Sequence, residues 1–216
     1  MGYVITIAQR KGGAGKTTLA CQLAAALLEI GYRVGAIDLD DQKSFAYWAR
    51  LRRERLDDEP RFRLDAPSSY SLGAALRAHR ASSDFVIIDT APIADFAVKR
   101  AVREADLVLV PLQLTPLDLD ATLPTATLVG EEGRTARFFI NRAPPRARIA
   151  DFIREQIKKQ GLPTLEVEFG ARAAFAESIA KGAGVVETAP SSQAADEARR
   201  LARAVMATAG RTIQAA

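Results

Sequence analysis

The fold is decided near the start of the chain, where residues 3–18 read YVITIAQRKGGAGKTT. The β-branched run at 3–8 predicts a buried strand, and the pattern at 16–30, closed by Gly31, predicts a helix. Glycines between two such elements let successive backbone N–H groups converge on a phosphate, and the helix N-terminus adds a favourable dipole. The sequence therefore predicts a phosphate-binding loop. A glycine-rich turn that merely joins strand to helix accounts poorly for the Gly-Lys-Thr ending.

Nucleotide chemistry gives each loop residue an expected role. Lys16 should reach the β- and γ-phosphates, and the hydroxyl of Thr17 should hold Mg²⁺. The full Walker A pattern would place a glycine at position 10, where this chain has Arg10. The other residues expected to bind the nucleotide form the cradle itself, and they are Gly12, Gly13, Ala14, Gly15 and Thr18.

Apolar runs and helical patterns alternate along the rest of the chain. Such alternation produces βαβ units, so the predicted fold class is α/β, with a parallel β-sheet flanked by helices on both faces. One domain over residues 1–216 is expected, and the polar, Pro-containing stretch 57–69 is interpreted as a surface excursion. Further strands are predicted over 33–39, 84–89, 106–112, 136–141 and 164–169, and further helices over 42–56, 71–79, 94–105, 149–160 and 193–207.

The composition is that of a globular protein, with 48% apolar and 26% charged residues. No apolar run approaches the ~18 residues of a membrane span, and the N-terminus lacks the features of a signal peptide. A single cysteine, Cys21, cannot form an intrachain disulfide and is expected to be packed. These features predict a cytoplasmic protein. The net charge of +4 would tolerate a polyanion without proving nucleic-acid binding.

Asp89 ends the apolar run FVIID, which is the Walker B form. A carboxylate at the tip of that strand would lie beside the phosphate loop, where it can bind the hydration shell of Mg²⁺. Asp89 is therefore a predicted metal residue together with Thr17. His79, the only histidine, has no partner motif and is expected at the surface or at a helix end.

The loop KGGAGKTT at 11–18 resembles the deviant Walker A of the ParA/MinD group of P-loop ATPases, and the chain is similar to the ParA family over nearly its whole length. The resemblance is to a short form without an N-terminal DNA-reading domain. In that family the extra lysine, here Lys11, reaches across a dimer interface to the nucleotide of the other subunit. The resemblance thus implies that Lys11 and Lys16 are catalytic residues, with Lys11 acting like an arginine finger in trans.

Residues 38–44, DLDDQKS, resemble the D-x-D-P-Q-G-S segment of ParA-like proteins. The resemblance implies that Asp40 orients the attacking water and that Asp38 supports the Mg²⁺ site, while a helix N-cap remains the alternative for this pair. Asp41 and Lys43 depart from the family pattern, so the turn after the carboxylates is expected to differ in shape. Asn141 begins an Asn-Arg pair that ParA-like proteins use near adenine, so the resemblance implies that Asn141 contacts adenine. A GTPase would show N-K-x-D at this place, which the chain lacks, so ATP is favoured over GTP.

The family resemblance implies an ATPase that forms an ATP-sandwich homodimer and binds DNA non-specifically, and that is slow alone. A ParB-like or other cargo-adaptor protein would stimulate hydrolysis, and the cargo would be a plasmid, a chromosome or a protein complex on the nucleoid. Basic residues in the C-terminal third are the candidate DNA contacts. They are Arg146, Arg148, Arg172, Lys181, Arg199, Arg200 and Arg203.

Two other functions remain open at this point. A MinD-like ATPase would associate with a membrane through a C-terminal amphipathic helix, but the tail at 204–213 is small and only weakly apolar. A metabolic P-loop ligase of the dethiobiotin-synthetase type would share the glycine-rich loop and would turn over ATP only with a small acid.

Overall fold

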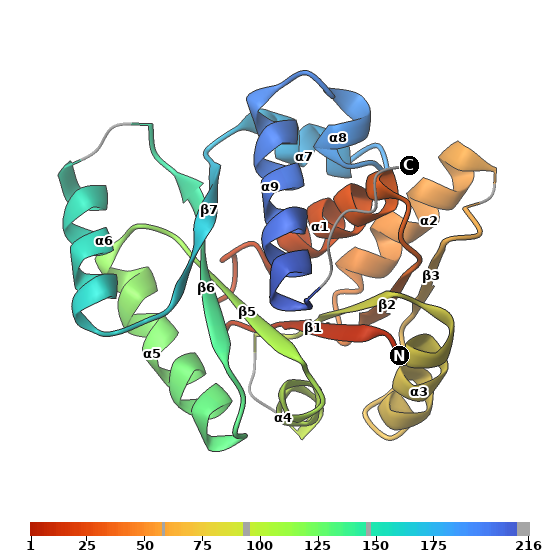
Figure 1. The fold of residues 1–216 in the computed structure, drawn as a ribbon, viewed down its shortest axis with the longest axis horizontal. Helices are drawn as coiled ribbons and strands as arrows, with labels where there is room; N and C mark the ends of the chain where they lie inside the picture. Colours follow the sequence, from red (N-terminus) through yellow and green to blue (C-terminus); the bar gives the residue numbers. More distant parts are fainter. Residues whose placement is uncertain (58, 93–95, 146–147, 211–216) are drawn as a thin grey trace.

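The computed structural model describes residues 1–57, 59–92, 96–145 and 148–210. Within them a single sheet of seven parallel strands runs in the order β3-β2-β4-β1-β5-β6-β7 (Figure 1). Its strands are β1 (Tyr3–Ile7), β2 (Val34–Asp38), β3 (Phe62–Asp65), β4 (Phe85–Asp89), β5 (Leu107–Leu112), β6 (Ala136–Ala143) and β7 (Thr164–Gly170).

Helices cover both faces of this sheet, as Figure 1 shows. One face carries α1 (Lys16–Ile30), α2 (Ser44–Leu56), α7 (Ala173–Ile179), α8 (Val185–Thr188) and α9 (Gln193–Thr208). The other face carries α3 (Leu72–Ser82), α4 (Phe96–Arg103), α5 (Pro116–Glu131) and α6 (Arg148–Lys159). The predicted α/β architecture is therefore confirmed.

The central strands are apolar throughout because both of their faces are covered. On β1, Ile5 and Ile7 belong to the core beneath α1, whereas Val4 packs with the residues beneath α3. The helix α1 is buried from Leu19 to Leu28, and Cys21 lies inside it, as expected. Its N-terminus is thereby held directly above the end of β1.

The stretch 57–69 was interpreted as a surface excursion, and that interpretation is wrong. It contains β3, which pairs in parallel with β2 at the edge of the sheet. Four residues with only Phe62 and Leu64 apolar are too short a pattern to predict a strand. The expectation of a surface His79 is also wrong, because its side chain is 1% exposed and its Nε2 lies 3.0 Å from Asp65.

Three helices were not predicted. Short α7 and α8 have too few residues for a periodic pattern, and α5 carries polar residues on its inner side and Pro124 in its interior. Thr115 begins α5 by accepting a hydrogen bond from the backbone N–H of Asp118, with Pro116 in the first turn. In the described part of the chain, every helix is too short or too polar to span a lipid bilayer.

Candidate nucleotide-binding site

The candidate site lies at the carboxyl ends of the central strands, where ligands bind in open parallel sheets. The phosphate loop leaves β1, and β1 is flanked by β4 and β5. A cavity of about 480 Å³ opens there. It is lined by Gly12, Gly13, Gly15, Lys16, Thr17, Thr18, Asp40, Asp41, Gln42, Ala91, Pro92 and Arg142. Most of the predicted loop residues, together with Asp40, therefore line one cavity.

The loop needs glycine at two of its positions. Gly13 and Gly15 have φ values of 76° and 95°, which side-chain-bearing residues rarely adopt. A Cβ at Gly15 would also overlap the amide of Asn141. Gly15 is the residue before α1, so this left-handed turn sets the angle at which the helix N-terminus faces the cavity.

Lys16 and Thr17 lie at the start of α1 and face the end of β4. Burial lowers the pKa of Lys16, which is 7% exposed, and the carboxylates of Asp89 and Asp40 oppose that shift. The hydroxyl of Thr17 donates to Asp89 Oδ2 at 2.6 Å. Both side chains therefore point toward the position that phosphates would occupy at the helix N-terminus.

Asp89 is buried, and its Oδ1 atom has no hydrogen-bond partner among the residues that the structure describes. Burial raises the pKa of its carboxyl to about 7, and the hydrogen bond from Thr17 opposes that shift. A buried carboxylate oxygen without a partner beside a threonine hydroxyl fits a hard divalent cation. No three His, Cys, Asp or Glu side chains gather as ligands in the described residues. Mg²⁺ does not require such a cluster, because it keeps waters and binds through one or two protein groups plus phosphates.

Asp38 and Asp40 have different surroundings. Asp38 is buried, and its two oxygens accept from the backbone N–H groups of Asp40 at 3.0 Å and Ala46 at 2.9 Å. It therefore organises the turn and the first turn of α2, which is the capping alternative for this residue. Asp40 is half-buried, lines the cavity and accepts from the N–H of Gln42. Lys43 has a φ of 50°, a left-handed conformation that the glycine of the family pattern would adopt more readily, and the altered turn shape stays a prediction.

Lys11 lies at the outer end of the loop. Its side chain is 36% exposed, and its Nζ is 2.7 Å from Asp118 Oδ2 on α5. The hydroxyl of Thr115 donates to the same carboxylate oxygen at 2.5 Å. In this structure, then, the signature lysine is paired within its own chain and lies outside the group of residues lining the cavity.

Sequence reasoning missed the contribution of α5. Gln9 donates to Thr122 at 3.0 Å and accepts from Thr125 at 3.1 Å, so polar residues of α5 hold the start of the loop. With Asp118 they recur at i, i+4 and i+7 on one side of the helix. That spacing is visible in the sequence. A row of polar residues on one side of a helix, however, normally indicates a side exposed to solvent, so the spacing alone does not predict a buried contact with the loop.

Asn141 is 3% exposed and donates to the carbonyl of Ala14 at 2.8 Å. Its amide nitrogen therefore braces the phosphate loop, and the adenine contact expected of it remains a prediction. Arg142, which was not predicted, lines the cavity with a φ of 53°.

The seven candidate DNA contacts do not form one surface. Arg146 lies outside the described residues, and Arg172 and Arg199 form ion pairs with Glu197 and Glu29, both at 2.7 Å. Arg200 donates to the carbonyl of Glu166. Three remain exposed without an ion pair to any described residue, on opposite faces of the sheet: Arg148 on α6, and Lys181 and Arg203 on or beside the helices of the other face.

Comparisons with known proteins agree with this geometry. The family described as ATPase MipZ matches residues 3–129, more than half of the chain. A protein named maintenance of carboxysome distribution protein A from Halothiobacillus neapolitanus is 27% identical over 94% of this chain and 96% of its own length. A protein of the same name from Gloeobacter kilaueensis is 31% identical over 85% of this chain and 84% of its own length.

Among solved structures, the ATP complex of an McdA variant from Cyanothece matches the fold with a TM-score of 0.80 at 15% identity, covering 100% of this chain and 99% of that one. The glycine-rich loop between β1 and α1, the threonine–aspartate pair behind it and these matches lead to one assignment. The chain belongs to the MipZ family of ATPases, within the ParA/MinD type of P-loop protein.

Proposed function

We propose that this ATPase binds Mg·ATP in the loop cavity, dimerises face to face over two nucleotides, and uses that state to position cargo on DNA. The observation that carries the proposal is the placement of two lysines in one loop. Lys16 is buried in the cavity, and Lys11 lies at the outer end of the loop. Lys16 is 7% exposed, whereas the side chain of Lys11 is 36% exposed. A buried lysine serves the nucleotide of its own chain, and a lysine at the rim is available to another.

Each residue of the site has a task in this cycle. Lys16 and the N-terminus of α1 bind the β- and γ-phosphates, and Thr17 with Asp89 holds the metal ion. When bound, Mg²⁺ neutralises charge on the transferred phosphoryl group. Asp40, half-buried at the cavity, orients the attacking water. Positioning and charge neutralisation supply most of the acceleration, since phosphoryl transfer asks little covalent chemistry of the protein.

Lys11 completes the site of the second subunit. Its pairing with Asp118 leaves more than a third of the side chain exposed, so the ion pair is one of the weaker kind and can be exchanged. In the dimer its ammonium group would leave Asp118 for the more highly charged phosphates of the facing nucleotide. Hydrolysis is then slow in the single chain because one catalytic charge is missing.

DNA binding and cargo follow from the family resemblance. Lys181 and Arg203, which are exposed on the same face of the sheet, are the favoured contacts, and a dimer doubles their number. Two of the relatives are named for carboxysome distribution, which favours a protein assembly as cargo over a plasmid. A cargo-bound adaptor protein would stimulate hydrolysis, and the ATPase would reside in the cytoplasm on the nucleoid.

The test is retention on non-specific duplex DNA across a salt series, with ATP, with ADP and without nucleotide, alongside the molecular mass in solution. We expect dimers and DNA retention only with ATP, and a salt slope that steepens by roughly one unit per phosphate contact. Lys16→Ala should lose nucleotide binding. Lys11→Ala should keep nucleotide binding and lose both dimer and DNA retention.

Lys159→Ala is the matched control, because this lysine lies on α6 and is 62% exposed in an i,i+4 pair with Glu155. It should behave as the unmodified protein. Retention that ignores the nucleotide, or a Lys11→Ala variant that still forms ATP-dependent dimers, would contradict the proposed cycle.

A further inference from the structure

The edge strand β3 leaves backbone groups available for another strand. It is the last strand in the sheet order and pairs with β2. The N–H of Val34 donates to the carbonyl of Arg61 at 2.7 Å, and successive residues of a strand in a parallel ladder turn their backbone groups to alternate sides. The groups of Arg63 therefore face β2, whereas the N–H and C=O of Leu64 face away from the sheet. An edge of this kind is a template for pairing with a further chain.

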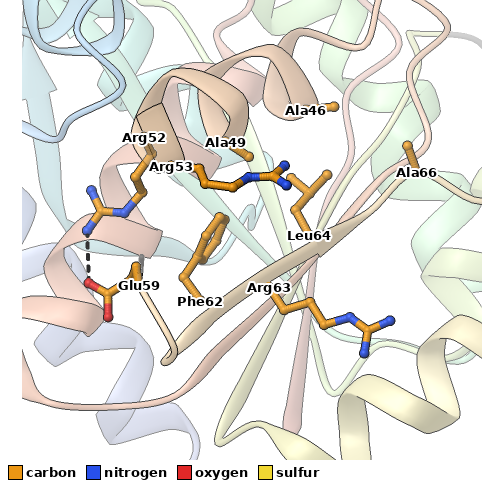
Figure 2. A pocket seen from close by; sticks show the side chains of 9 residues that line it. All are labelled: Ala46, Ala49, Arg52, Arg53, Glu59, Phe62, Arg63, Leu64 and Ala66. Atoms are coloured by element: carbon orange, nitrogen blue, oxygen red, sulfur yellow. Dashed lines mark ion pairs between the residues drawn. The ribbon is translucent and has the colours of Figure 1, made fainter. Parts of the chain in front are cut away.

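A cavity of about 510 Å³ lies beside this edge, between α2 and β3 (Figure 2). Its apolar wall is formed by Phe62 and Leu64 from the strand and by Ala46 and Ala49 from the helix. The two alanines create the space, because their side chains end at Cβ where longer residues would fill the gap. A strand added at the edge would therefore find room for its apolar side chains.

Arginines surround this apolar wall. Figure 2 shows Arg53 extending from α2 toward Leu64 and Arg63 extending from the strand. Arg53 is exposed and forms no ion pair with any described residue, while the Arg63 side chain is 70% exposed and meets Asp65 at 3.3 Å. Three arginines against one glutamate line the cavity. Arg53 and the largely exposed Arg63 are therefore the cations that an incoming carboxylate can reach, since Arg52 is buried and already ion-paired.

The third arginine, Arg52, lies deeper. It is 3% exposed and pairs with Glu187 at 2.8 Å and with Glu59 at 3.5 Å. Its Nε atom is buried and has no hydrogen-bond partner in the described part of the chain. A buried donor left unpaired is destabilising, so an acceptor supplied at the cavity would be stabilising.

We propose that this cavity docks an extended acidic segment of a partner protein, which adds a strand to β3. Its backbone would pair with Leu64, and its apolar side chains would fill the space beside Ala46 and Ala49. Its carboxylates, which alternate to the other face of the strand, would meet Arg63, and Arg53 on α2 would add positive charge beside the same edge. Strand addition obtains affinity from the backbone and specificity from alternate side chains. A nucleic acid would satisfy the arginines but neither the strand edge nor the apolar wall.

The cavity is connected to the nucleotide site through α2. The N–H of Ala46, which lines the cavity, donates to Asp38 beside the phosphate loop at 2.9 Å. A docked segment would therefore contact the helix whose first turn is fixed by that carboxylate. The docking itself does not require the proposed ATPase cycle, and its test needs no nucleotide.

The probe is a fluorescein-labelled octapeptide of alternating valine and glutamate, titrated with the full chain and followed by fluorescence anisotropy. We expect salt-sensitive binding of this peptide. The alternating valine–lysine octapeptide should not bind, because its charge is wrong. The acidic octapeptide methylated at alternate backbone nitrogens should bind about tenfold more weakly, since it keeps the charge but loses the strand pairing.

The variant Arg53→Glu/Arg63→Glu should weaken binding of the acidic peptide by at least about tenfold. Arg50→Glu is the matched control, because Arg50 lies on the same helix, is exposed and does not line the cavity. Thermal unfolding of each variant establishes that it is folded. A third variant, Ala46→Leu, keeps every charge and should weaken binding by filling the space.

Several outcomes would overturn the proposal. One is the absence of acidic-peptide binding, and another is equal binding by Arg50→Glu and Arg53→Glu/Arg63→Glu. Full affinity for the N-methylated peptide would exclude strand addition. A labelled DNA duplex that binds with the same dependence on Arg53 and Arg63, while the acidic peptide does not, would assign the surface to nucleic acid instead.

Discussion

The two ends of the phosphate loop differ in their surroundings. The inner end, at Lys16, is buried in the core, whereas the outer end, at Lys11, is held by an ion pair to Asp118 of α5 and is partly exposed. Lys16 and the half-buried Thr17 line the cavity, and the buried Asp89 accepts from Thr17 behind it. Lys11 is paired with Asp118 and remains more than a third exposed. This difference is what the proposed cycle requires, in which Lys16 serves the nucleotide of its own chain and Lys11 serves that of the other subunit. One is fixed where phosphates of its own chain bind, and the other is held in a contact that it can leave.

Replacing Lys16 by alanine should have the largest effect. The loss of a buried charge aimed at the phosphates should lower hydrolysis by at least about 100-fold and abolish measurable ATP binding. Isothermal titration with ATP and steady-state phosphate release measure the two effects. Lys11→Ala in parallel should retain ATP affinity, and equal loss of affinity in both variants would remove the distinction between the two ends.

Gly15→Ala tests how rigidly the inner end is fixed. The residue has a φ of 95°, and the added Cβ would overlap the amide of Asn141, so the free energy of unfolding should fall by about 2 kcal/mol. Urea unfolding monitored by circular dichroism measures this. Gly12→Ala is the control, because its Cβ would meet nothing within 4 Å, and it should stay within about 0.5 kcal/mol of the unmodified protein.

Asp118→Asn tests the outer end. The ion pair has one partner in contact with solvent, so its removal should lower the free energy of unfolding by about 1 kcal/mol or less, and by less still at high salt. ATP affinity of the single chain should not change. The exposed Asp120 of the same helix supplies the control, Asp120→Asn. A large loss of ATP affinity in Asp118→Asn alone would show that Lys11 serves its own chain.

Protonation of His79, whose side chain is buried, should have the smallest effect on the free energy of unfolding. Burial lowers its pKa below 6.5, although Asp65 opposes the shift. Because the folded-state pKa is depressed, the associated stability is present above about pH 6.5 and is lost as the pH falls through the folded value. As the only histidine, it gives an unambiguous imidazole signal in an NMR titration. A midpoint above 6.5 would mean that the pairing with Asp65 outweighs burial.

Sequence reasoning succeeded where local chemistry and position coincide. The loop between a predicted strand and helix lines one cavity, and the carboxylate at the end of FVIID contacts that loop through the hydrogen bond from Thr17 to Asp89. Phosphate and metal binding require a fixed order of residue types, namely glycines, a lysine, hydroxyls and an aspartate. This pattern can therefore be recognised from the sequence without tertiary information.

Prediction failed where tertiary contacts decide. The polar residues of α5 are satisfied by Gln9 and Lys11, more than a hundred residues away in sequence, and nothing local to the helix reveals that. Asp38 accepts from two backbone N–H groups of the following turn, a role that its sequence position did not reveal, while its expected support of the metal site stays a prediction. The strand β3 forms because its backbone pairs with β2. The pattern of its own four residues is too short to predict a strand.

The burial of α1 along nearly its whole length has a consequence for amide hydrogen exchange. The helix packs against α2, α7, α8 and α9, so its amides cannot open to solvent unless those contacts are broken together. Exchange in the second and third turns of α1 should then proceed through global unfolding. Because ligands that bind only the native state raise the unfolding free energy, these amides would report phosphate occupancy at the helix N-terminus from within the core.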